Sequence, residues 1–404
     1  MKILYLCHRT PFPPNKGERI RTFHQIEYLH RKGHEISVFA PTFEATDADN
    51  LKALEAKYCE RTFHAPAPGK LALVKALLSG SALSVNNFYS RTLQRQLDEF
   101  ISAHTVDAIV CTSSSMAAYV FRSKAIDLTG GQHPTLVMDF MDLDSDKWRQ
   151  YQSLKGLPLS LIYGREAKLI AALEQKIHNH FDACLLISQA EVDLFLHTIN
   201  DTGKLHVVAN GLDTEAFQPS TEPKPETGPV LLFTGVMDYL PNEDAVAWFV
   251  ESAWTKLKQA HPDAVFYIAG MNPSSRVKAL AKYPGVEVTG FVDDIRTYYD
   301  RAHIFIAPFR LARGVQNKVL QAFACALPTI TTPMGCEGIN CEAGKEVLVA
   351  DTVEAMLKHI DWVIANPDQA QQLGTNAMRL IQDHFSWDSQ LACFESLLQP
   401  ASSH

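Results

Sequence analysis

The chain has 404 residues, of which 46% are hydrophobic and 20% charged, and its formal net charge is −8 at pH 7. This length exceeds what one compact core normally serves, so we expect two domains of ordinary size. The composition excludes a disordered or fibrous chain, and the acidic balance argues against a general nucleic-acid-binding protein, which would carry a basic excess.

The first 34 residues differ from this average because they carry seven basic and two acidic side chains. Such an excess suits an anionic ligand or a membrane surface, although a solvated helix face accounts for it equally well. No secretory signal opens the chain, and its longest uncharged stretch, 319–336, is interrupted by Pro328 and Pro333. We therefore expect a cytoplasmic protein without a membrane span, for which peripheral contact with the inner face of the plasma membrane stays open.

The eight cysteines and sixteen histidines form no pattern that is typical of metal ligands. The chain has no Cys-x-x-Cys pair and no His-Glu-x-x-His spacing, so we expect no metal site and no disulfide framework. Most cysteines are expected to be reduced thiols in the core.

The chain begins with the pattern of a βαβ unit. A strand is expected over Ile3–Cys7, then a Pro/Gly loop, a helix that ends at Gly33, and a second strand over Glu35–Ala40. This order predicts a parallel sheet. Further strands are expected over 108–111, 136–139, 183–187 and 205–208, with a long helix from about 158 to 180.

The composition changes near residue 213, because 214–229 contains four prolines and several charges, as an exposed linker does. The alternation then restarts, with strands over 230–234, 264–269, 286–289, 304–307 and 329–331 and helices over 244–259, 276–281 and 315–325. We therefore expect an α/β protein of two doubly wound domains, 1–205 and 230–380, joined by a linker region, 206–229. Ligands of such sheets bind beyond the carboxyl ends of the strands, here in a cleft between the domains. The remaining segment, 381–404, contains a last helix over Trp387–Leu398 that we expect to fold back onto the first domain.

The most informative segment is 304–328, where a strand leads into a basic loop and then a helix. Arg310, Arg313 and Gly314 lie in the loop, and Lys318 lies in the first helical turn. The free N–H groups at a helix start carry partial positive charge, and Gly314 allows an anion to approach the backbone. Three cations at a helix start are unusual unless an anion neutralises them. A diphosphate is the natural candidate, and a cationic surface turn is the alternative.

The first βα turn repeats this theme with Lys16, Gly17 and Arg21. It is not a G-x-G-x-x-G fingerprint, so it supports dinucleotide binding only weakly, and a proline-stiffened turn is the alternative.

A second candidate segment follows the strand over 136–139, where the carboxylates Asp139, Asp142, Asp144 and Asp146 come close together. A carboxylate at this edge of an α/β sheet orients a sugar hydroxyl or acts as a base. For some of these aspartates, N-capping and turn roles are the alternative, and a Mg²⁺ site is another that we do not favour.

Together these segments resemble the family-four glycosyltransferases of the GT-B fold, a resemblance that extends over essentially the whole chain. The matching segments occur in the family's order, at Ile187-Ser188, Val208–Pro219, Gly235, Gly290–Asp294 and 304–333. The subfamily that the chain resembles most is that of the sugar transferases associated with PEP-CTERM and exosortase exopolysaccharide loci, on segments 139–148, 235–242 and 313–318.

The resemblance implies a retaining, metal-independent, hexosyltransferase-type enzyme in exopolysaccharide or other cell-surface glycan biosynthesis. It implies no cofactor, a nucleotide-sugar donor on the C-terminal domain, and a glycan or lipid-linked sugar acceptor on the N-terminal one. Lys16, Gly17 and Arg21 are then expected in the acceptor or phosphate loop. The catalytic residues are expected to be Lys318, Arg313, Asp142 and Asp139, and the donor-binding residues Gly235, Phe291, Val292, Arg310, Gly314, Val315, Gln316 and Gln321.

The chain departs from the family pattern at two places. The family's Glu-x7-Glu pair is replaced by Arg313 and Gln321, and the loop 237–242 has no cation. An arginine cannot accept hydrogen bonds from a sugar, whereas Gln321 still binds ribose hydroxyls. Neutralisation of a diphosphate must then come from Arg310, Arg313 and Lys318. A nucleotide-sugar epimerase and a non-catalytic sugar- or nucleotide-binding protein are the two alternative functions.

Overall fold

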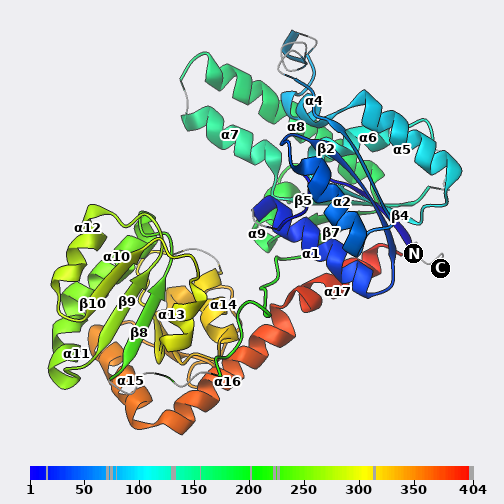
Figure 1. The fold of residues 1–404 in the computed structure, drawn as a ribbon. Helices are drawn as coiled ribbons and strands as arrows, with labels where there is room; N and C mark the ends of the chain where they lie inside the picture. Colours follow the sequence, from blue (N-terminus) through cyan, green and yellow to red (C-terminus); the bar gives the residue numbers. More distant parts are fainter. Residues whose placement is uncertain are drawn as a thin grey trace. The chain divides into compact units, whose positions relative to one another are not determined.

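The computed structural model describes residues 1–14, 17–69, 72, 76–78, 80–128, 133–154, 156–200, 203–221, 224, 228–312 and 315–399. The chain divides into two compact units (Figure 1). The first unit comprises Met1–Asn210 and Gln390–His404, and the second comprises Gly211–Ser389. The expected domains were 1–205 and 230–380, with the linker region between them.

The first unit is built on a seven-stranded parallel sheet with the order β3-β2-β1-β4-β5-β6-β7. Its central strands are almost completely buried, as expected for a parallel sheet with helices on both faces. The strands are β1 (Lys2–Leu6), β2 (Glu35–Thr42), β3 (Arg61–Pro66), β4 (Ala108–Thr112), β5 (Thr135–Met141), β6 (Ala183–Leu186) and β7 (Leu205–Val207).

The helices of the first unit include the chain's last helix, which the sequence assigned to this place. Glu395 on that helix accepts hydrogen bonds from Tyr28 Oη (3.0 Å) and pairs with His34 Nε2 (3.0 Å), so the expected return of the chain to the first domain is confirmed. The helices are α1 (Gly17–Arg31), α2 (Asp47–Tyr58), α4 (Leu83–Phe88), α5 (Arg91–Ala103), α6 (Ala117–Arg122), α7 (Asp144–Leu154), α8 (Leu159–His180), α9 (Gln189–Leu196) and α17 (Trp387–Leu397).

The second unit is built on a six-stranded parallel sheet with the order β10-β9-β8-β11-β12-β13. Its strands are β8 (Val230–Thr234), β9 (Val265–Ala269), β10 (Val286–Gly290), β11 (Ile304–Ala307), β12 (Thr329–Thr331) and β13 (Leu348–Val349). Its helices are α10 (Leu240–Phe249), α11 (Thr255–Ala260), α12 (Ser275–Ala279), α13 (Arg296–Arg301), α14 (Asn317–Ala324), α15 (Val353–Ala365) and α16 (Pro367–His384). The single helix expected over 244–259 is α10 and α11 joined by a π-helical turn, Val250–Trp254.

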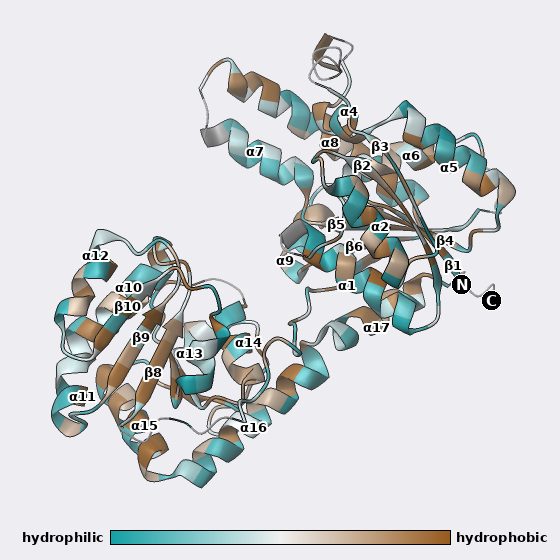
Figure 2. Ribbon diagram, viewed as in Figure 1, coloured by the Kyte–Doolittle hydropathy of each residue, from teal (hydrophilic) through white to brown (hydrophobic). Residues whose placement is uncertain are grey.

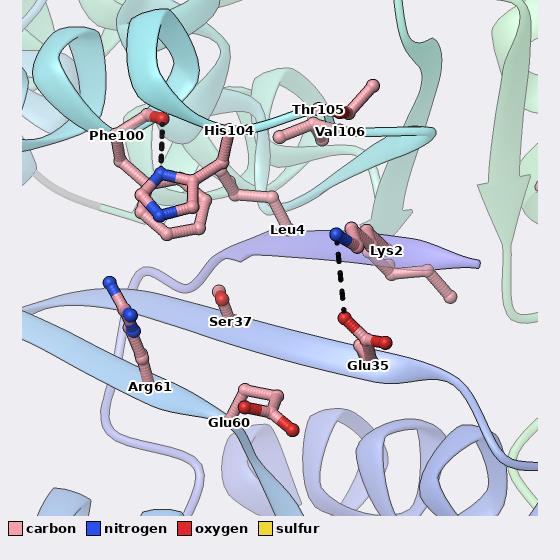
Figure 3. A pocket seen from close by; sticks show the side chains of 11 residues that line it. Lys2, Leu4, Glu35, Ser37, Glu60, Arg61, Phe100, His104, Thr105 and Val106 are labelled. Carbon is pink, nitrogen blue, oxygen red and sulfur yellow. Dashed lines mark hydrogen bonds and ion pairs between the residues drawn. The ribbon is translucent and has the colours of Figure 1, made fainter.

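A small cavity of about 160 Å³ lies at the amino ends of β1 and β2 in the first unit (Figure 3). Lys2 and Glu35 meet there at 3.9 Å, and both side chains are more than half exposed. Ligands of parallel α/β sheets bind at the opposite, carboxyl edge, so this cavity is not the candidate site. No helix in the described part of the chain is long and apolar enough to cross a bilayer.

Candidate functional site

The strand order of each sheet fixes where a ligand is expected. It reverses between β8 and β11 in the second unit and between β1 and β4 in the first. Open α/β sheets bind ligands at the carboxyl edge beside such a reversal, so the side chains and loops that follow these strands are the candidates. The candidate residues fall into two groups, one at each of these edges.

In the second unit, Lys318 is a half-buried cation for which the described residues supply no ion pair. It lies in the first turn of α14, and its Nζ donates a 2.6 Å hydrogen bond to Asn242 Oδ1. The rings of Phe233 and Phe309 lie 5.2 and 5.0 Å from Nζ. Burial lowers the pKa of Lys318 to about 8, and within the described ranges this lysine forms no ion pair. A desolvated ammonium held only by an amide and ring faces favours an incoming anion.

The backbone beside Lys318 requires glycine. A Cβ on Gly235 would lie 2.6 Å from Asn242 Nδ2 and 3.3 Å from Lys318 Nζ, and its φ of +158° is one that other residues rarely adopt. A Cβ on Gly270 would lie 1.8 Å from the Gly235 carbonyl oxygen. Asn242 is held in place because its Nδ2 donates to Val236 O at 2.9 Å. The loop after β8 therefore positions the amide that holds Lys318.

Arg310, unlike Lys318, has a carboxylate partner among the described residues. Arg310 pairs with Asp244 on α10 through two hydrogen bonds, one of them from Nε at 3.0 Å, and its guanidinium lies 5.5 Å from the Trp248 ring. The positive charge of Arg310 is thus balanced by Asp244, and its role in neutralising a diphosphate stays a prediction. Arg313 and Gly314 lie outside the described residues.

Gln321 is connected to the core of its domain. Tyr299 Oη donates to Gln321 Oε1 at 3.1 Å and also lies 2.8 Å from Thr234 Oγ1. Burial raises the pKa of Tyr299, so this hydroxyl remains protonated. Gln321 Oε1 thus already accepts one hydrogen bond within the domain, and the binding of ribose hydroxyls by this side chain stays a prediction. Val315 and Gln316 come directly before α14, whose first internal amide donor is Val319, bonded to Gln316 O at 2.9 Å.

Exposed hydrophobic side chains gather in the loops that follow β8, β9, β10, β11 and β12. They include Phe291, which is 69% exposed, beside the half-buried Val292. We call this set the apolar rim: Val236, Tyr239, Leu240, Met271, Phe291, Leu311, Val315 and Met334. These side chains follow the strands at the same carboxyl edge as Lys318, and such a set suits an amphiphilic ligand with a flat ring and an anionic group.

In the first unit, Arg21 and Asp139 require a correction. They bind each other through Nε–Oδ2 (2.7 Å) and Nη2–Oδ1 (3.1 Å), and their exposures are only 1% and 0%. Arg21 also donates to Val208 O (2.8 Å), and Gln25 donates to Asp139 (2.6 Å). Buried charges persist only when they are paired and fully hydrogen-bonded. These two buried residues therefore form an ion pair inside the domain, which gives them a structural role in place of the exposed one expected from the sequence.

Asp142 remains at the carboxyl edge, because it is exposed just beyond β5. Its pKa is raised by partial burial and by repulsion from Asp144, whose carboxylate accepts a 2.7 Å hydrogen bond from Ser114 Oγ. The preceding residue, Met141, has a φ of +64°, and Ser113 after the neighbouring strand β4 has +73°. Such strain in non-glycine residues gathers at functional sites. Gly17 is the first residue of α1, and Lys16 lies outside the described residues.

Sequence reasoning missed a pair at the β1–β4 reversal. Thr112 Oγ1 accepts a 3.2 Å hydrogen bond from His8 N and lies 3.0 Å from His8 Nδ1. Beside it, the Arg9 guanidinium lies 4.0 Å from the Phe43 ring centroid. The position of His8 directly after the first strand was the available signal. The described residues contain no group of three or more His, Cys, Asp or Glu side chains that could hold a metal ion.

Comparison with known proteins finds a family match for part of the second unit. Residues 228–366 match the model of the family described as group 1 glycosyl transferases. That segment contains all the candidate residues of the second unit.

Over the whole chain, sequence identity to known proteins is low, but the structural superpositions cover nearly the full length. An uncharacterized 44.6 kDa protein in the cps region of Klebsiella pneumoniae is 21% identical, over 95% of this chain and 96% of that protein. Sucrose-phosphate synthase from Thermosynechococcus elongatus superposes with a TM-score of 0.61 at 16% identity, over 98% of each chain. HepE from Anabaena in complex with UDP superposes with a TM-score of 0.59 at 15% identity, over 98% of this chain and 100% of that chain. The chain has the GT-B fold.

Proposed function

We propose that the protein is a glycosyltransferase that moves a sugar from a nucleotide-sugar donor to an acceptor hydroxyl, in the synthesis of exopolysaccharide or another cell-surface glycan. The family match of the second unit and the GT-B fold support this reaction class. HepE structures that contain UDP or UDP-glucose support the donor class, and the cps-region relative supports the glycan context. The observation that carries the proposal is the half-buried ammonium of Lys318, held at the start of α14 by Asn242 Oδ1 and the rings of Phe233 and Phe309 with no ion pair among the described residues.

The donor's diphosphate is proposed to bind at Lys318 and the amino end of α14. As the bond from the anomeric carbon to the diphosphate oxygen breaks, negative charge grows on the leaving phosphate. A partly desolvated cation that Asn242 already holds in place stabilises that charge with little reorganisation. The amides of Asn317 and Lys318 precede the first internal donor of the helix and supply a partial positive charge. The base of the nucleotide is proposed to lie on the apolar rim near Phe291 and Val292.

The acceptor is proposed to bind the first unit, where Asp142 orients a hydroxyl of a glycan or lipid-linked sugar. His8, on the neighbouring β1–β4 reversal, is a second polar group at the same edge. Retention of configuration, independence of metal ions and membership of the PEP-CTERM-associated subfamily are part of the proposal.

Lys318→Ala tests the donor site, with Lys256→Ala as the control, because Lys256 belongs to the same unit and its side chain is 61% exposed. Titration calorimetry with UDP, GDP and ADP, and with their sugars, measures affinity. Loss of a charge-assisted contact predicts a ten- to hundredfold weaker affinity, by order of magnitude, in Lys318→Ala alone. Equal affinities of Lys318→Ala and the unmodified protein would refute the donor site. Incubation with donor alone distinguishes an epimerase, which makes a new nucleotide sugar without an acceptor.

A further inference from the structure

The exposed hydrophobic side chains of the first unit concentrate on one surface outside the candidate site. Most of them lie where α7 and α8 form an antiparallel hairpin and on the segment that precedes α4 (Figure 1). Leu78, Leu157 and Leu161 are 84%, 76% and 68% exposed. We call this set the hairpin surface: Leu77, Leu78, Tyr151, Leu157, Leu159 and Leu161. Figure 2 shows hydrophobic residues along α8 beside the more hydrophilic α7.

Hydrogen bonds join the two parts of the hairpin surface. Arg165 Nη2 on α8 donates to Ser81 O at 3.0 Å, three residues after Leu78. Leu161 precedes Arg165 by four residues and therefore lies on the same face of the helix. Glu166 is completely buried and accepts hydrogen bonds from the backbone amides of Leu83 (2.8 Å) and Ser84 (2.7 Å). These hydrogen bonds hold the segment that precedes α4 against α8, which brings the two groups of exposed leucines onto neighbouring segments.

The stretches around these leucines are rich in basic residues, although Asp144, Asp146 and Glu166 adjoin the second stretch. Residues 61–97 contain five basic residues and residues 147–165 contain four, and neither contains Asp or Glu, although the whole chain has 45 acidic and 37 basic residues. Lys147 and Arg91 are exposed. Arg149 and Arg95 are also exposed, but they lie 3.6 Å from Asp146 and 3.9 Å from Glu99, respectively, in surface ion pairs, which are weak. Exposed leucines framed by cations are the chemistry of a protein surface that enters the headgroup region of an anionic bilayer.

The basic amino-terminal helix α1 presents fewer free positive charges to an anionic membrane than its sequence suggests. Arg19 and Arg21 on α1 are buried, and Arg19 Nη2 lies 3.3 Å from Glu44 and 3.8 Å from Asp47. Their charges are neutralised inside the unit, so the cationic character of residues 1–34 overstates what α1 presents to a membrane.

We propose that the hairpin surface docks the protein onto an anionic phospholipid bilayer, with its leucines inserted among the headgroups and the neighbouring lysines and arginines on the lipid phosphates. The charge of the two segments selects this occupant, because an acidic interface attracts them whereas a second copy would place cations against cations. Since α7 begins two residues after Asp142, docking also brings the edge proposed for the acceptor near lipid, and that consequence alone rests on the proposed function.

Flotation of the full-length protein with vesicles tests the docking. We expect binding to vesicles of 70% phosphatidylcholine and 30% phosphatidylglycerol, weak binding to pure phosphatidylcholine, and release by high salt. The double variant Leu78→Ser/Leu161→Ser should lower the partition coefficient about tenfold or more, because less apolar area enters the interface. The control Leu196→Ser/Val207→Ser changes exposed residues of the same unit outside the hairpin surface and should bind as the unmodified protein does.

Three outcomes would overturn the docking proposal. The first is no binding of the unmodified protein to anionic vesicles, and the second is equal binding of the Leu78→Ser/Leu161→Ser variant. The third is a dimer that this variant converts to a monomer in light scattering, which would assign the surface to a second copy. Melting temperature and UDP affinity are measured in parallel, so a failure to fold and a failure of the donor site are each distinguished from a failure of docking.

Discussion

Replacement of Lys318 by methionine should stabilise the protein while it removes anion binding. The ordinary pKa of lysine, 10.5, describes the unfolded chain, whereas burial lowers the pKa of Lys318 to about 8 in the folded protein. Each pKa unit corresponds to about 1.36 kcal/mol. The charged form of Lys318 therefore lowers the free energy of unfolding by about 3 kcal/mol. Methionine keeps most of the side chain's volume and carries no charge.

The pH dependence of this gain has a definite sign. Below pH 8 the lysine is protonated in both states, so the full cost of its burial is present and methionine gains the most. As the pH rises from 8 to 10.5, the folded protein releases its proton first, and the difference between the two proteins disappears. The lost hydrogen bond to Asn242 Oδ1 offsets about 1 kcal/mol, which leaves a net gain of about 2 kcal/mol at pH 7.

Urea unfolding at pH 7 and pH 10.5 measures this difference, with Lys256→Met as the control because Lys256 is exposed and should change stability little at either pH. UDP should raise the melting temperature of the unmodified protein and of the control but not of Lys318→Met. A Lys318→Met protein that is less stable than the unmodified one at pH 7, or one that UDP still stabilises, would refute the reasoning.

Three further substitutions test other parts of the account. Gly235→Ala should weaken UDP binding at least about tenfold in calorimetry, because its Cβ would lie 2.6 Å from Asn242 Nδ2 and displace the amide that holds Lys318; normal affinity would contradict this. Asp139→Asn should destabilise the protein by about 3 to 5 kcal/mol in urea, because it leaves Arg21 buried without its counterion, and an unchanged unfolding midpoint would show that the pair is dispensable. Asp142→Asn should keep the affinity for UDP and lose transfer to the acceptor in a nucleotide-release assay, and full turnover would remove Asp142 from the proposal.

Much of the fold followed from local sequence patterns. Buried parallel strands are continuous apolar runs, so Val230–Thr234 and Ile304–Ala307 were located with their exact bounds. The strand β3 was missed, because Arg61–Pro66 lies at the sheet edge and mixes polar with half-buried residues. The single helix expected over 244–259 contains a π-helical turn that an apolar repeat does not reveal.

The helix start that carries Lys318 was predictable from the sequence, but the partners of the candidate residues were not. The position of Lys318 at the start of a helix after a strand pointed to an anion site from sequence alone. Its partner Asn242 lies 76 residues away, and Asp244, which balances Arg310, lies 66 residues away. Likewise, Arg21 and Asp139 are 118 residues apart, so their ion pair could not be anticipated from spacing. Partners this distant meet only when the sheet is assembled.

The pKa of Lys318 in solution tests the central claim most directly. It can be measured by NMR of protein labelled at the lysine ε-carbon, with the resonance of Lys318 assigned by its loss in Lys318→Met. We predict a value near 8 in the free protein and a rise towards 10.5 when UDP is saturating, because a bound diphosphate stabilises the charged form. A value near 10.5 in the free protein, or one that saturating UDP leaves unchanged, would contradict the assignment of this lysine as the donor's phosphate ligand.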